Sequence, residues 1–147
     1  YVQESFEYNG AELENSKDLI SVLWSGADIL PSKIVCFHNP DEENGFLSNW
    51  YTSHFETEGR KFSSMEQYMM DKKAVCFKDD DIAIKILGSI DVARIKALGR
   101  LVRNYNDSYW SGIRQIVVYE GLLAKFKQNE DLKRKLLGTG NSILADE

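Results

Sequence analysis

The stretch Ser63-Ser64-Met65-Glu66-Gln67-Tyr68-Met69-Met70-Asp71-Lys72-Lys73-Ala74-Val75-Cys76-Phe77 decides how the fold of this chain is interpreted. At about 100° per residue, its larger apolar side chains gather on one broad arc of a helix: Met65, Tyr68, Met69, Met70, Cys76 and Phe77. Glu66 and Lys73 fall inside that arc, two helical turns apart on one face. The pattern predicts a core-facing helix over residues 64–77 that carries two charges on its apolar side.

A charged side chain on a core-facing stripe costs free energy unless it is paired or used. A carboxylate flanked by Met and Phe has its pKa raised by desolvation, while a nearby cation opposes that shift. Such a carboxylate can act as a general base or stabilise positive charge. The alternative is that Ser63-x-x-Glu66 is a capping box, in which Glu66 accepts from the Ser63 backbone N–H. Periodicity alone favours the capping function.

The segments on either side of this helix differ in their predicted secondary structure. Before it, the β-branched run Ile34–Phe37 predicts a strand, residues 51–57 and 60–62 predict a hairpin, and residues 15–25 predict a short helix. After it, the pattern is helical over 80–87, 90–101, 108–127 and 130–137. The expected N-caps are Ser63, Asp79, Ser89, Asp107 or Ser108, and Asn129. Strands early and helices late predict an α+β fold, with a small antiparallel sheet packed against a mostly helical domain.

Length and composition favour one soluble domain. The 147 residues are 43% apolar and 28% charged, and no run of 18 apolar residues occurs. Two cysteines without CxxC spacing, two histidines and no basic leader predict a cytoplasmic protein without a metal site. The net charge of −5 argues against general binding to nucleic-acid backbones, although local basic residues can still bind a small anion.

Seven motifs follow one another in an order that resembles the NADAR family, which includes the YbiA-like proteins. They are Phe37, Leu47-Ser48-Asn49-Trp50, Ser64-Met65-Glu66-Gln67-Tyr68 with Lys73, Leu98-Gly99-Arg100, Trp110 with Arg114, Lys125-Phe126, and Leu136-Leu137-Gly138-Thr139-Gly140. We therefore expect residues 34–147 to form a NADAR domain and residues 1–33 to be an N-terminal elaboration of the same single domain.

The chain departs from the family pattern at two places. Gln67 stands where the family commonly has His. The family pattern also continues to an acidic residue and an Asp-x-x-Trp-Gly motif that helps form the pocket, whereas this sequence ends at Leu144-Ala145-Asp146-Glu147. The resemblance thus implies a NADAR domain whose C-terminal motif is missing from the sequence.

The resemblance implies N-glycosidase chemistry with Glu66 as the catalytic carboxylate and no cofactor or metal. It also implies substrate-binding residues: Asn49, Lys73, Arg100, Trp110, Phe37 and Ser64. Characterised relatives cleave ribosylaminopyrimidine intermediates of riboflavin synthesis or remove ADP-ribose from guanine bases. The expected substrate is therefore a small nucleoside or nucleotide, or an ADP-ribosylated base that can belong to a nucleic acid. We expect no membrane partner, and the oligomeric state does not follow from the sequence.

Two other interpretations fit the same sequence. The chain can be a non-catalytic module that binds ADP-ribose or a nucleotide, or an interaction domain that recruits a partner through helix 108–127. The apolar residues of that helix are explained by its own core. Several candidates also have a structural alternative: an ion pair with Glu66 for Lys73, a solvated helix end for Arg100, and core packing for Trp110. Asn49 can simply bond within its own turn.

Overall fold

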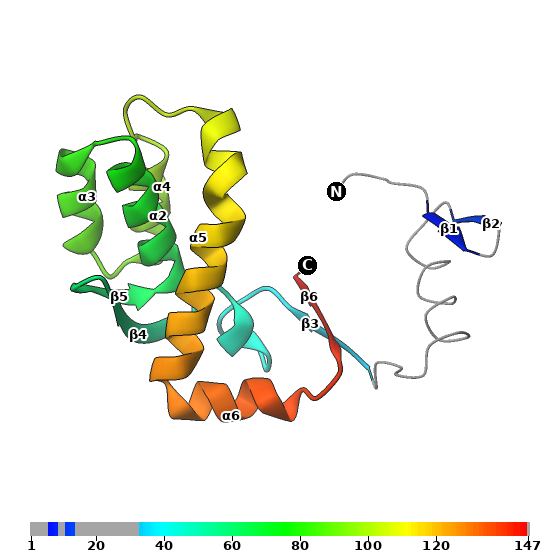
Figure 1. Ribbon diagram of the computed structural model, residues 1–147. Helices are drawn as coiled ribbons and strands as arrows, with labels where there is room; N and C mark the ends of the chain where they lie inside the picture. The colour runs from blue at the N-terminus through cyan, green and yellow to red at the C-terminus, as the bar shows by residue number, and fades with distance from the viewer. Residues whose placement is uncertain (1–5, 9–10, 14–32, 147) are drawn as a thin grey trace.

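The computed structural model describes residues 6–8, 11–13 and 33–146. In this part of the chain, short strands come first, helices follow, and one further strand ends the described residues; this mixture confirms the predicted α+β class (Figure 1). The described helices are α2 (Met65–Cys76), α3 (Asp80–Leu87), α4 (Val92–Gly99), α5 (Asp107–Gln128) and α6 (Glu130–Gly138). Their bounds lie within two residues of the predicted ones. The side chains that cap α2 to α5 are Ser64, Asp79, Asp91 and Asn106, so only the predicted cap of α3 is confirmed among these four, and Asn129 precedes α6 without a side-chain cap bond. The short helix predicted over residues 15–25 falls outside the described residues.

The described strands form two-stranded pairs. The predicted hairpin is present as β4 (Thr52–Thr57) and β5 (Arg60–Ser64), which pair antiparallel, and β1 (Phe6–Tyr8) also pairs antiparallel with β2 (Ala11–Leu13). A pairing that the sequence did not predict joins β3 (Ile34–Phe37) to β6 (Ile143–Asp146) in parallel, with Phe37 opposite Asp146. Parallel strands require a long connection, and here the helices α2 to α6 provide it.

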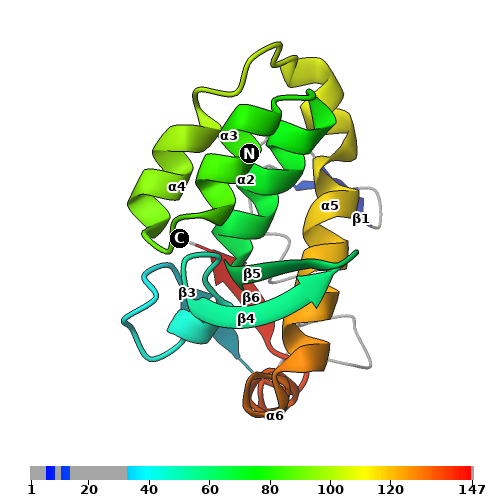
Figure 2. The same ribbon diagram turned by 90° about the vertical axis from the view of Figure 1, so that its left-hand side faces the viewer.

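Helix α2 lies at the centre of the helical layer, with α3 and α4 on one side and α5 on the other (Figures 1 and 2). One buried cluster joins α2 to α3 and α4 and consists of Ala74, Ile82, Ala83, Ile86, Ile95 and Val102. A second joins α2 to the β4–β5 hairpin and to α5, and is built on Phe55, Phe62, Met65, Tyr68 and Met69. Burial on both sides holds α2 rigidly, which is what a site on this helix needs.

The cap of α2 lies one residue later than a Ser63–Glu66 capping box requires. The Ser64 hydroxyl accepts from the backbone N–H of Gln67 at 3.1 Å, and Gln67 Oε1 accepts from the backbone N–H of Ser63 at 2.7 Å. The cap is displaced because strand β5 extends through Ser64, so that the helix begins only after this residue. Gln67 therefore makes the return bond that the alternative interpretation gave to Glu66.

Two carboxylates on or next to these helices are fully buried and structural. Asp71 of α2 pairs with the guanidinium of Arg60, whose Nε donates at 3.0 Å. Asp79 caps α3 through Ile82 N–H and accepts from Arg103, and these bonds hold its pKa below the usual range. Buried carboxylates with such partners are satisfied, so neither is a candidate for chemistry.

The sequence predicted that the apolar residues of α5 are explained by core packing. On the outer face of this helix the structure differs from that prediction. Val117 and Leu122 pack on the cluster around Tyr68, whereas Ile116 and Leu123 are 61% and 41% exposed. The difference arises because α2 covers only one side of α5. Among the described residues, no helix combines the length and the apolarity needed to cross a membrane.

Candidate functional site

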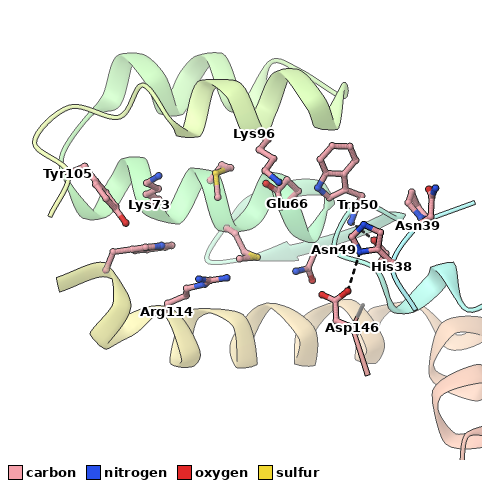
Figure 3. A pocket seen from close by; sticks show the side chains of 15 residues that line it. His38, Asn39, Asn49, Trp50, Glu66, Lys73, Lys96, Tyr105, Arg114 and Asp146 are labelled. Atoms are coloured by element: carbon pink, nitrogen blue, oxygen red, sulfur yellow. Dashed lines mark hydrogen bonds and ion pairs between the residues drawn. The ribbon is translucent and has the colours of Figure 1, made fainter. Parts of the chain in front are cut away.

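A cavity of about 690 Å³ opens where the loop after β3, the loop before β4, and the helices α2, α4 and α5 meet (Figure 3). Small-molecule sites commonly have volumes of about 300–1,000 Å³, so this one can hold a nucleotide. The side chains and backbone of the following residues line it: His38, Asn39, Pro40, Ser48, Asn49, Trp50, Glu66, Met69, Met70, Lys73, Lys96, Tyr105, Trp110, Arg114 and Asp146.

Glu66 lies in the first turn of α2 and faces this cavity (Figure 3). The residue is only 7% exposed, and its backbone N–H donates to the carbonyl of Asn49 at 2.9 Å. Its carboxylate takes no part in the cap of α2, and no hydrogen bond or ion pair of the described residues uses it. A buried carboxylate that is committed to no structural partner is available to a ligand.

The charges around Glu66 act on its pKa in opposite directions. Burial raises the pKa of this carboxyl above its ordinary value. The positive charges of Lys96, Arg114, Lys73 and Arg100 oppose that rise, in this order of effect. The cavity is therefore locally positive in a chain whose net charge is −5. Such a site favours an anionic ligand while it keeps Glu66 able to exchange a proton.

Four of the residues singled out from the sequence meet in the cavity: Asn49, Glu66, Lys73 and Trp110. Lys73 is not ion-paired with Glu66; its ammonium lies 4.4 Å from the ring centroid of Tyr105, and burial lowers its pKa. Trp110 is 6% exposed and both packs and lines the cavity, so the packing and binding interpretations are compatible.

The other three candidates lie elsewhere. Arg100 is the exposed C-cap of α4. It influences the site only through its positive charge, which lowers the pKa values of Glu66 and Lys73. Phe37 packs on the buried cluster that contains Val35 and Leu132 and is not among the lining residues. Ser64 caps α2 and borders a second cavity of about 180 Å³ instead.

Sequence reasoning missed several lining residues. Lys96 could have been found, because it lies one turn before Arg100 on the same face of α4. His38 and Asp146 could not, since the parallel pairing of β3 with β6 brings His38 Nδ1 within 3.5 Å of Asp146 Oδ1. Trp50 also lines the cavity, and the Lys96 ammonium lies 5.5 Å from its ring centroid.

Comparison with known proteins gives similarities over most of the chain. The NADAR domain family matches residues 36–147. An N-glycosidase of Acanthamoeba polyphaga mimivirus is 37% identical over 122 residues, which are 78% of this chain and 72% of that protein. A riboflavin biosynthesis protein of Vibrio vulnificus is 32% identical over 112 residues, covering 76% of this chain but only 30% of that longer protein.

The fold also matches a solved structure. The NMR structure of the Escherichia coli protein YbiA superimposes with a TM-score of 0.69 and covers 81% of this chain and 69% of that one. The sequences are 22% identical in this comparison. At this identity the likeness shows the YbiA-like fold, in agreement with the α+β class predicted from the sequence.

Proposed function

Because this chain belongs to the NADAR family, we propose that it is an N-glycosidase, which hydrolyses the bond between a ribose and a nitrogen base. One observation carries the proposal: Glu66 is a buried carboxylate that has no structural partner among residues 33–146, and it faces a cavity surrounded by cations. The similarity to a viral N-glycosidase over most of both chains supports the same reaction class.

Glu66 has two roles in the proposed reaction. As the C1′–N bond breaks, its electron pair leaves with the base, and positive charge builds on C1′ and O4′ of the ribose. A carboxylate beside these atoms stabilises that charge. It also accepts a proton from the water whose oxygen bonds to C1′. Glycosidases acting on O-linked sugars divide such tasks between two carboxylates. A nucleobase or aminopyrimidine delocalises its own charge, so that a single carboxylate suffices.

The substrate we propose carries phosphate as well as a base. Lys73, Lys96 and Arg114 line the cavity with positive charge, and guanidinium and ammonium groups of this kind bind phosphate oxygens. The aromatic rings of Trp50, Tyr105 and Trp110 offer faces for stacking of a base. ADP-ribosylated guanine and phosphorylated ribosylaminopyrimidines both combine these features. The riboflavin-related name of the Vibrio protein supports the second class.

Product analysis tests the proposal directly. The protein is incubated with ADP-ribosylated guanine in DNA and, separately, with ribosylaminopyrimidine phosphates, and the products are identified by mass spectrometry. From one of the two classes we expect products: either ADP-ribose and unmodified guanine within the DNA, or ribose phosphate and a free aminopyrimidine. ADP-ribose binding without any product would instead favour the non-catalytic nucleotide-binding module.

The pH dependence of kcat/KM tests the charges around Glu66. The acid limb of this profile reports the pKa of the group that must be ionised in the free enzyme. Because Lys96 is the largest influence lowering the pKa of Glu66, Lys96→Met should raise that pKa further and move the acid limb to higher pH. Arg94→Met, which removes an exposed cation of the same helix outside the cavity, is the control and should leave the limb in place. An unmoved limb in Lys96→Met would assign the limb to another group.

A further inference from the structure

Lys125 is a fully buried cation of α5 to which the reaction gives no role. Its exposed fraction is 0%. None of the ion pairs found among the described residues joins Lys125 to a carboxylate. Its ammonium donates instead to the backbone carbonyls of Phe46 at 2.7 Å and Ser48 at 3.2 Å. The aromatic rings of Phe126 and Tyr51 lie next to the ammonium, with centroids 5.1 and 5.7 Å from Nζ. The Lys125-Phe126 motif of the sequence analysis thus points into the molecule.

Burying this ammonium is costly. Desolvation lowers the pKa of Lys125 to about 8, since the charged form loses its hydration and no carboxylate in the described part of the chain pairs with it. A Met of similar length would fill the space without that cost. What Met cannot supply is a donor for the two carbonyls. Among the described residues, Lys125 is the donor to the Phe46 carbonyl, while the Ser48 carbonyl also accepts from the Tyr51 N–H at 3.2 Å.

The segment that Lys125 holds is a wall of the candidate site. It runs from the 3₁₀ turn η1 (Gly45–Leu47) to the start of β4, and Ser48, Asn49 and Trp50 within it line the cavity. On its other side, the Asn49 carbonyl accepts the backbone N–H of Glu66 at 2.9 Å. The segment is therefore held between the ammonium of α5 and the first turn of α2.

We propose that Lys125 is a positioning residue, whose ammonium holds the carbonyls of Phe46 and Ser48 and thereby sets where Asn49 and Trp50 stand relative to Glu66. Its importance for catalysis rests on the function proposed above. The structural part does not, because the geometry of the segment can be measured without a substrate. The two tests below therefore separate failure of this inference from failure of the proposed reaction.

The first test compares Lys125→Met with Lys127→Met, which removes an exposed cation two residues along the same helix. In ¹⁵N NMR spectra of the free proteins, recorded well below the unfolding temperature, the amide signals of Asn49, Trp50 and Glu66 should shift in Lys125→Met only. On a substrate that the wild type cleaves, kcat per folded molecule should fall at least about tenfold for Lys125→Met, the size of effect expected from misplacing groups around the reacting atoms. Lys127→Met should match the wild type in both measurements.

The second test needs no variant and decides the matter if Lys125→Met does not fold. In ¹⁵N-lysine-labelled wild type below pH 8, the Lys125 Nζ signal should show slowly exchanging protons and couplings to the carbonyl carbons of Phe46 and Ser48. A folded Lys125→Met protein with unshifted Asn49 and Trp50 signals would overturn the inference, as would a rapidly exchanging Nζ. Full activity of Glu66→Gln would overturn the proposed reaction and leave both NMR results valid.

Discussion

Replacing Glu66 by Gln should lower kcat on a cleaved substrate by on the order of 10³-fold, the combined scale of losing a general base and a charge-stabilising group. Gln keeps the shape of the side chain, but its neutral amide neither accepts the proton of the attacking water nor stabilises an oxocarbenium-like ribose. Because Glu66 caps nothing and has no ion-pair partner among the described residues, the variant should fold as the wild type does. KM should change far less than kcat.

The measurement is turnover followed by mass spectrometry of the products, together with a thermal unfolding curve of each protein. Glu120→Gln is the matched control, since Glu120 is an exposed acid of α5 outside the cavity. It should retain wild-type kcat and stability. If Glu66→Gln cleaved substrate at the wild-type rate, the assigned mechanism would be wrong, whatever the reaction proved to be.

Gly121→Val should lower the free energy of unfolding by about 3 kcal/mol or more, because overpacking a core commonly costs about 1–3 kcal/mol and Val adds more than one carbon here. A Cβ atom at Gly121 would overlap Tyr68 Cε1 and would lie 2.9 Å from Met65 Cε. The Tyr68 ring is 1% exposed and lies edge-on to Phe62 with centroids 5.2 Å apart, so it has no room to move away.

Urea unfolding monitored by circular dichroism measures this effect. Gly112→Ala is the control on the same helix, since a Cβ there meets no atom within 4 Å. It should be neutral or gain up to about 1 kcal/mol, the usual preference of a helix for Ala over Gly. Equal stabilities of Gly121→Val and Gly112→Ala would contradict the close packing of α5 on α2, which supports the helix that carries Glu66.

Much of the fold could be predicted from the chain because its signals are local. The helix 80–87 was predicted with the bounds that α3 has, since Asp79 and Gly88 mark its two ends in the sequence. The turn at Glu58 and Gly59, which both adopt positive φ angles, marked the hairpin. The cap of α2 was predicted one residue early, because Ser63 and Ser64 are alike in the sequence. In the structure, β5 pairs as far as Ser64, and the Ser64 hydroxyl caps the helix.

The site was predictable only in part. Glu66 and Lys73 were recognisable because two charges interrupted an apolar face, and Asn49 and Trp110 came from the resemblance to a family. Lys125 was recognised as part of a motif, but no role could be predicted for it, since nothing in a sequence distinguishes a buried ammonium from an exposed one. The pairing of His38 with Asp146 depends on two strands that are more than 100 residues apart, and contacts at such separations leave no local pattern.

By itself, the sequence determined the helices α2 to α6, the strand β3, the β4–β5 hairpin, and which acid interrupts an apolar helix face, because periodicity and capping act between residues a few positions apart. Only the tertiary structure decided that Gln67 takes the capping bond, that Glu66 faces a cavity, and that cations from α2, α4 and α5 surround it. The physical reason is that burial and electrostatic fields come from whatever packs nearby in space, which the order of residues along the chain does not reveal.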